Sequence, residues 1–196
     1  MEVIDNSKTC RIIPFLANQV AAGERSVLVE PKFEKKGALK LVGLRYVGPM
    51  DPQVFPALWE KFMGKLMGAG FSMTGEWSAF GLCRCEGSCE EGKVDYMAAI
   101  DASMLKKPIE GFEATELPAS EYAVFECPSL GKVGEVYEEI YGKWLPKSGF
   151  IPGKYSFEFY PSDFMPEGPI TRLYLYVPVT KAGPAKKGGC GCCNCG

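Results

Sequence analysis

The chain has 196 residues, of which 46% are hydrophobic and 23% are charged, and these proportions are typical of one folded domain with short appendages. The formal net charge of -2 does not indicate a nucleic-acid partner, and no apolar run reaches the ~18 residues of a membrane-spanning helix. We therefore expect neither a direct nucleic-acid partner nor a membrane partner. The amino terminus lacks the basic region and the apolar stretch of a signal peptide, which favours a cytoplasmic location.

The sequence contains no histidine. This absence excludes Ser-His-Asp and Cys-His catalysis, histidine metal ligands and an imidazole base. Any catalysis must therefore depend on carboxylates, tyrosines, lysines, cysteines or bound water.

The first half of the chain predicts two strands, a helix and two further strands. Residues 1–26 form a predicted N-terminal arm, strands follow over 27–34 and 39–47, and we interpret Lys36-Gly37 between them as a hairpin turn. Asp51 is a predicted cap for a helix over 52–67. Its apolar stripe consists of Phe55, Leu58, Trp59, Phe62, Met63 and Leu66. The strand candidates after this helix are 76–85 and 94–103.

The second half repeats this order. Strands are predicted over 112–117 and 121–127, a helix over 128–145, and closing strands over 155–160 and 170–179. The helix stripe consists of Val133, Val136, Tyr137, Ile140, Tyr141 and Trp144. "LVGLRYVGP" in the first half aligns with "YAVFECPSL" in the second, and "AFGLC" aligns with "SFEFY". Two duplicated modules, about 27–103 and 111–179, predict an α+β fold with pseudo-twofold symmetry and a ligand cleft where the modules join.

The stretches "EYAVFECPSLGKVGEVYEEIYG", "YGKWLPKSGF" and "YSFEFYPSD" resemble the GyrI-like small-molecule-binding domain, also called the AraC-type effector-binding domain. The resemblance covers roughly 27–179, and we take 27–180 as the domain. It implies two strand-helix-strand-strand modules that form antiparallel sheet around a central ligand cleft, with the helices packed on one side. Regulators of this family carry a helix-turn-helix domain on the same chain. Because only 26 residues precede the first predicted strand, we expect a stand-alone member.

Members of this family bind bulky compounds that are often aromatic or cationic, and they carry a glutamate in the equivalent of "FEFY", which is Glu158 here. From the alternation of side chains along strands, we expect Glu158, Tyr160, Tyr174 and Tyr176 to line the cleft, with the purely apolar faces of these strands against the helices. Gly81, the counterpart of Glu158 in the repeat, would leave room for a ligand. The alternative is that Glu158 is exposed, or forms an ion pair with Arg172 or Arg45.

Three functions remain open. The first is binding or sequestration of a drug-like or toxic small molecule, in which Trp59, Trp144 and Tyr96 also line the cleft. The alternative for the two tryptophans is a place in the core, and for Tyr96 it is a half-buried position without a role in the site. The second, which the resemblance implies, is hydrolysis of a cyclopropane-bearing electrophile, with Glu158 orienting or deprotonating water and Tyr96 donating a hydrogen bond. Neither needs a cofactor, and no protein partner can be named.

The third function depends on the cysteines. Cys190, Cys192, Cys193 and Cys195 lie in a tail over 181–196 whose composition predicts flexibility. Clustered thiolates can bind zinc or another soft metal, so the chain could act as a metal or redox sensor. A second group, Cys83, Cys85 and Cys89, could meet the first; the alternative is a tail that is merely oxidisable.

Overall fold

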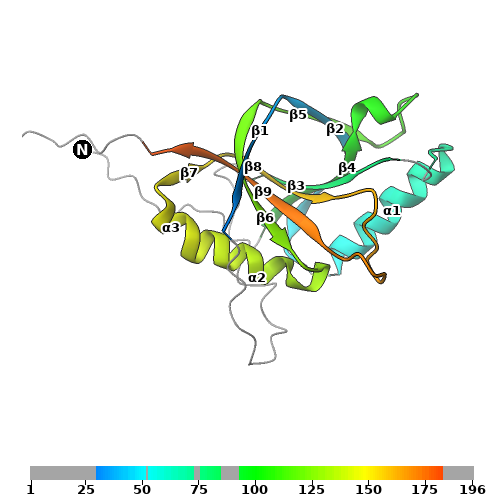
Figure 1. Ribbon diagram of the computed structural model, residues 1–196. Coiled ribbons are helices and arrows are strands. Elements are labelled where there is room, and N and C mark those ends of the chain that lie inside the picture. The colour runs from blue at the N-terminus through cyan, green and yellow to red at the C-terminus, as the bar shows by residue number, and fades with distance from the viewer. Residues whose placement is uncertain (1–29, 52, 73–75, 85–92, 183–196) are drawn as a thin grey trace, which may run out of the picture.

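The computed structural model describes residues 30–51, 53–72, 76–84 and 93–182 (Figure 1). The first half comprises β1 (Lys32–Lys36), β2 (Leu39–Pro49), α1 (Val54–Gly68), β3 (Ala79–Arg84) and β4 (Lys93–Asp101), followed by the short helical turn η2 (Ala102–Met104). The second half comprises β5 (Glu113–Leu117), β6 (Ser120–Cys127), η3 (Leu130–Lys132), α2 (Val133–Glu138), η4 (Glu139–Trp144), α3 (Leu145–Ser148), β7 (Phe150–Pro152), β8 (Tyr155–Tyr160) and β9 (Leu173–Lys181). The predicted order of strands and helices is confirmed in both halves, except that the short strand β7 in the second half was not predicted.

All the strands join one nine-stranded antiparallel sheet in the order β1-β6-β9-β8-β3-β4-β2-β5, and the short β7 pairs with the end of β9. The sheet is symmetric about its middle when strands are matched by their places in the sequence repeat. Counted inward from one edge, the strands are β1, β6, β9 and β8; counted inward from the other edge, their counterparts are β5, β2, β4 and β3. A pseudo-twofold axis therefore passes between β8 and β3. This arrangement confirms the predicted α+β fold of two pseudo-symmetric modules.

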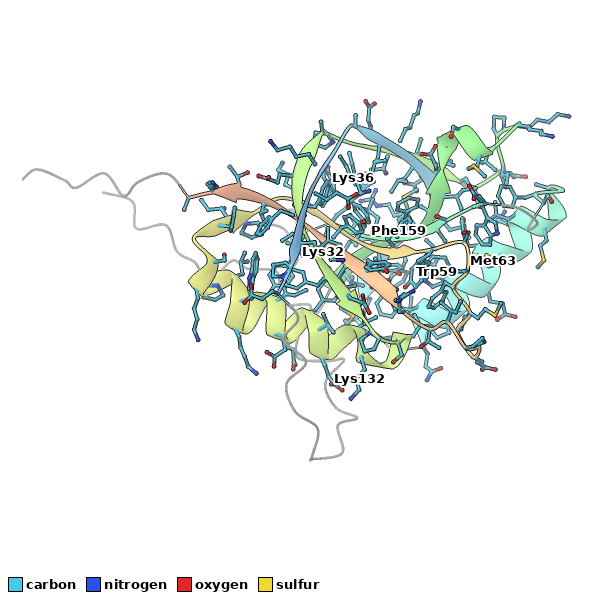
Figure 2. The ribbon with its side chains drawn as sticks, in the orientation of Figure 1. Lys32, Lys36, Trp59, Met63, Lys132 and Phe159 are labelled. Atoms are coloured by element: carbon cyan, nitrogen blue, oxygen red, sulfur yellow. The ribbon has the colours of Figure 1, made fainter. Side chains whose placement is uncertain are left out.

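The two edge strands are exchanged between the halves. The predicted hairpin at Lys36-Gly37 is wrong, because β1 pairs with β6 of the second half, from Lys32 opposite Val124 to Lys36 opposite Ser120. Equally, β5 of the second half pairs with β2 of the first. Lys32 and Lys36 mark the two ends of β1 along the curled edge of the sheet in Figure 2. Each module thus supplies the outer strand of the other, which ties the two modules into one unit.

The helix α1 forms where the sequence predicts a helix, but it begins at Val54, and its N-cap residue is Gln53 rather than the predicted Asp51. A carboxylate oxygen of Asp51 accepts a hydrogen bond from the backbone N–H of Gln53 at 2.9 Å and so satisfies one of the N–H groups that a helix start leaves free. The apolar stripe places Phe62 and Leu66, both fully buried, against the strands of the first half. Burial of such side chains stabilises a fold by about 1.5–3 kcal/mol each.

The second helical segment differs from α1 in one way that the periodicity does not predict. Between α2 and α3 the chain winds as the π-helix η4, and Pro146 occupies the first turn of α3. A π-turn adds a residue to the helical turn and so changes which side chains face the sheet after it. The segment ends at Gly149, whose φ of 72° is a left-handed conformation that glycine adopts without strain.

Both helical segments lie on the same face of the sheet (Figure 1). The register shows why: Ala98, Gly81, Glu158 and Leu175 are successive cross-strand partners, and directly opposite residues point to the same face. Ala98 packs in the cluster under α1, and Leu175 packs in the cluster under α2. We call this the helix face, and its reverse the opposite face.

The opposite face carries its own hydrophobic core inside the curl of the sheet. Fully buried members of this core are Leu41, Leu82, Met97, Leu117, Tyr122 and Phe157. Among the helices of the described segments, none has both the length and the apolar character that a membrane crossing requires.

Candidate functional site

Glu158 lies at the centre of the sheet, on the helix face. It is directly opposite Gly81 of β3 and Leu175 of β9, and only 7% of its surface is exposed. The pseudo-twofold axis runs through the pair of Gly81 and Glu158, because the residues that correspond in the aligned repeat are equally spaced on either side of that pair. The carboxylate therefore occupies the point where the two modules meet.

Two tyrosines hold this carboxylate. The hydroxyl of Tyr96 donates to Glu158 Oε2 at 2.7 Å, and the hydroxyl of Tyr160 donates to the same oxygen at 2.5 Å. Trp59 Nε1 in turn donates to the Tyr96 hydroxyl at 3.2 Å. Oε1 accepts no hydrogen bond from any residue that the structure describes. One oxygen is thus fixed by the protein, and the other remains available.

No lysine or arginine in the described ranges forms an ion pair with Glu158. Arg45 instead binds Asp95 through two hydrogen bonds of 2.8 and 2.6 Å, and Arg172 is exposed. Both predicted alternatives for Glu158, an exposed position and an ion pair, are therefore wrong. A buried carboxylate without a cation is uncommon in a folded protein.

The surroundings raise the pKa of all three acidic groups in this cluster, Glu158, Tyr96 and Tyr160. Burial raises the pKa of the Glu158 carboxyl, and the hydrogen bonds from Tyr160 and Tyr96 oppose that rise only in part. Burial, followed by the charge of Glu158, raises the pKa of Tyr96 and of Tyr160 well above the ordinary value. Both tyrosines therefore keep their protons and remain hydrogen-bond donors.

Gly81 makes room for the cluster itself. A Cβ atom at this position would overlap the Tyr96 hydroxyl and Glu158 Oε2. The prediction that this glycine leaves space for a ligand is therefore corrected: the space beside Glu158 is occupied by Tyr96. A glycine is needed here because any side chain would displace the hydrogen bond between Tyr96 and Glu158.

Aromatic rings from several elements surround the two tyrosines. Trp59, on the side of α1 toward the sheet in Figure 2, meets the Tyr160 ring edge to face at a centroid distance of 5.2 Å. Phe55 of α1 contacts Tyr96 at 5.0 Å, and Phe164 of the β8–β9 connection contacts Tyr160 at 5.0 Å. Trp59 was predicted to line the site, whereas Phe55 and Phe164 were not identified as its neighbours.

The structure separates Tyr174 and Tyr176 from Glu158. They are the cross-strand partners of Phe159 and Phe157, and therefore lie on the opposite face. The expectation that these tyrosines share a face with Glu158 is wrong, because the register of β8 against β9 places Leu175 opposite Glu158. Tyr176 stacks on Phe157 at 4.7 Å and donates a hydrogen bond to Glu34 at 2.9 Å.

Trp144 also lies away from the carboxylate. Its ring packs against Phe125 at 5.1 Å and against Phe150 at 6.1 Å, near the outer strand β1. Its contacts are those of a half-buried core residue, which agrees with the alternative prediction for this tryptophan.

Two further polar side chains lie near the carboxylate. Tyr137 of α2 is buried in the same cluster as Tyr160, and its hydroxyl has no hydrogen-bond partner in the described part of the chain. Cys83 is buried with Tyr96 and forms no disulfide. Sequence reasoning placed Tyr137 only on an apolar stripe, and nothing in the pattern distinguished it from the core residues around it.

The predicted metal site lies outside the described residues. The four tail cysteines, Cys85 and Cys89 are not among them. Within the ranges that the structure describes, no group of three or more cysteine, aspartate or glutamate side chains could hold a metal ion. A soft-metal site formed by the tail remains a prediction.

The model of the GyrI-like small molecule binding domain family matches residues 29–180. Because this match covers most of the chain, the protein belongs to that family. No curated protein matches the chain.

Solved structures share the fold. SAV2435, solved bound to tetraphenylphosphonium, is 20% identical with a TM-score of 0.58, and the match covers 78% of this chain and 94% of that one. A putative transcription regulation protein from Staphylococcus aureus is 21% identical with a TM-score of 0.58, covering 76% and 97%. An integron cassette protein from Vibrio cholerae is 15% identical with a TM-score of 0.58, covering 77% and 96%.

Proposed function

We propose that this domain binds a bulky aromatic cation whose positive charge lies beside Oε1 of Glu158. The observation that carries the proposal is the buried carboxylate itself: two tyrosines fix one oxygen, and no cation of the described residues neutralises the charge. An unpaired buried charge is unfavourable, and a ligand cation would supply the missing partner. The domain would then act in sensing or sequestering such compounds.

The rings near Glu158 support an aromatic ligand. Trp59 is half-buried, and its indole lies over the Tyr160 side of the cluster. Aromatic faces attract cations and also pack against the aromatic groups of a ligand. The SAV2435 structure, which has the same fold, was solved with tetraphenylphosphonium, a cation of this class.

The full-length protein and its Glu158→Gln variant should be titrated with tetraphenylphosphonium by calorimetry. Losing one partner of a buried charge pair costs about 2–5 kcal/mol, so we expect the affinity to fall by at least about 30-fold. Glu126→Gln, which alters an exposed carboxylate on β6, is the matched control and should bind like the wild type. Equal affinities for wild type and Glu158→Gln would contradict the proposal.

Hydrolysis of a cyclopropane-bearing electrophile is a second candidate function, and the raised pKa of the Glu158 carboxyl favours it. A carboxyl whose pKa is raised by burial can exchange protons with water nearer neutral pH, and Tyr96 is a fixed donor beside it. Incubating the protein with such an electrophile separates the two functions. Turnover that disappears in Glu158→Gln supports the hydrolase, whereas saturable binding without product supports the binding protein.

A further inference from the structure

The hydroxyl of Tyr137 is a buried polar group that nothing in the described residues satisfies. Buried hydroxyls in folded proteins almost always have a hydrogen-bond partner, because removing them from water without one is unfavourable. Tyr137 is 7% exposed, so the bulk solvent does not replace the missing partner. Its position therefore leaves room for an acceptor that the described residues do not supply, such as one on a bound molecule.

This hydroxyl belongs to the helix face at the site of Glu158. Tyr137 lies on α2 just before the π-helix η4, and it packs in one cluster with Tyr160, Ala79 and Leu175. Residues Ala79 and Leu175 are neighbours of the Gly81–Glu158 pair in the sheet. The unsatisfied hydroxyl thus lies on the side of the site that faces α2, whereas Trp59 comes from α1 on the other side.

The chemistry of its surroundings makes Tyr137 a donor. Burial raises its pKa well above the ordinary value, and the negative charge of the nearby Glu158 adds to that rise, so the phenol keeps its proton. Oε2 of Glu158 already accepts from Tyr96 and Tyr160. Neither this oxygen nor any other acceptor in the described residues receives the proton of Tyr137, which leaves it for an oxygen acceptor on a bound molecule.

We propose that Tyr137 determines specificity by donating a hydrogen bond to an oxygen acceptor on the ligand. The ligand class is then narrower than aromatic cations in general: it comprises aromatic cations that also carry an ether or carbonyl oxygen on the side facing α2. This inference rests on the proposed function. A site with a buried donor discriminates against an analogue without the acceptor, because that analogue leaves the donor unpaired.

The test uses ligand pairs that differ only in the acceptor. The three isomeric (methoxyphenyl)triphenylphosphonium ions are compared with the three (ethylphenyl)triphenylphosphonium ions, which have nearly the same shape and no oxygen. Affinities are measured by calorimetry for the full-length wild type and for Tyr137→Phe. For at least one isomer we expect the methoxy compound to bind wild type about 3- to 10-fold more tightly than its ethyl partner, and this preference to disappear in Tyr137→Phe.

Tyr122→Phe is the matched control, because Tyr122 is a buried tyrosine on the opposite face, and it should leave the preference unchanged. A preference that is absent from wild type for all three isomers, or that persists in Tyr137→Phe, would overturn the inference while leaving cation binding intact. If neither ligand series bound, the proposed function itself would fail and the inference with it. The circular dichroism spectrum of the unliganded Tyr137→Phe protein should match that of the wild type, and its melting temperature should be equal or higher, since the substitution keeps the ring and removes an unsatisfied hydroxyl.

Discussion

The two halves of the sheet share one architecture and differ where they meet. In the aligned repeat, Gly81 of the first half corresponds to Glu158 of the second, and the structure places these two residues directly opposite each other. A carboxylate at both positions would put two like charges side by side on one face, which is destabilising. The symmetric sheet therefore has room for only one carboxylate at its axis, and the glycine on the other strand leaves space for that carboxylate and its tyrosine partner.

The groups that hold the charge break the symmetry as well. By the same alignment and register, Tyr160 corresponds to Cys83, and Tyr96 corresponds to Leu173. Glu158 receives one hydrogen bond from its own half and one from the other. The duplicated fold thus supplies the positions, and a few unequal residues at the joint supply the site.

A side chain at position 81 should disturb the site more than any of the other changes considered below. In Gly81→Ala the new Cβ overlaps the Tyr96 hydroxyl and Glu158 Oε2, so the cluster must shift. We expect a loss of about 1–3 kcal/mol in the free energy of unfolding, measured by urea denaturation, together with weaker cation binding. Gly64→Ala, on the exposed face of α1 with open space around it, should instead stabilise the protein by up to about 1 kcal/mol. Equal stability of Gly81→Ala and wild type would show that the site does not need the glycine.

A change of pH should remove the charge that distinguishes the second half. The pKa of Glu158 is raised, so protonation neutralises it at a higher pH than for an ordinary carboxyl. Affinity for tetraphenylphosphonium should fall by about tenfold per pH unit below that pKa, and Glu158→Gln should show no such dependence.

Stability of the unliganded protein should change in the opposite direction over the same pH range. Because the folded state holds the proton more tightly than the unfolded state, the contribution of Glu158 to stability rises as the pH falls from the raised pKa toward the ordinary value. The difference in unfolding free energy between wild type and Glu158→Gln isolates this contribution. A difference that stays constant with pH would contradict the shift.

Removing the hydrogen bond from the first half should have a smaller effect. In Tyr96→Phe the carboxylate loses a donor that lowers its pKa, so that pKa rises further and less of the charged form is present at neutral pH. We expect cation affinity at neutral pH to fall by about 3- to 10-fold. Tyr46→Phe, which removes a hydrogen bond to the Pro49 carbonyl, is the control and should bind normally. Unchanged binding by Tyr96→Phe would mean that the hydrogen bond from Tyr160 is enough to stabilise the Glu158 carboxylate.

The smallest effect is expected on the opposite face. Tyr176→Phe removes the hydrogen bond to Glu34, which should lower the free energy of unfolding by about 0.5–1.5 kcal/mol. Its affinity for tetraphenylphosphonium should equal that of wild type, since Tyr176 does not share a face with Glu158. A loss of affinity comparable to that of Glu158→Gln would indicate that the ligand contacts the opposite face, and it would contradict the proposed site on the helix face.

The sequence predicted the members of the site that local patterns reveal. Glu158 was indicated by the family motif, and the aligned repeat identified Gly81 as its counterpart. Tyr96 and Trp59 were also named, and the structure brings both into the hydrogen-bonded cluster.

The features that were missed depend on pairing between distant segments. The alternation of side chains along one strand does not reveal which of them share a face with the side chains of the neighbouring strand. A change of one residue in the pairing register moves every side chain of a strand to the other face of the sheet. That is why Tyr174 and Tyr176 were assigned to the wrong face. The exchange of β1 between modules has the same origin, since the Lys36-Gly37 turn looks like a local hairpin. Tyr137 could not be identified because its unsatisfied hydroxyl is visible only after packing.

The carboxyl of Glu158 offers the most direct test of the central claim that a ligand cation lies beside this one charge. Its titration can be followed by carbon NMR in the full-length protein, with Glu158→Gln used to assign the signal, in the absence and presence of saturating tetraphenylphosphonium. Our account predicts a midpoint above the ordinary value of about 4.3 in the free protein, and a clear fall of that midpoint when the cation binds. A midpoint that does not move at saturation would contradict it.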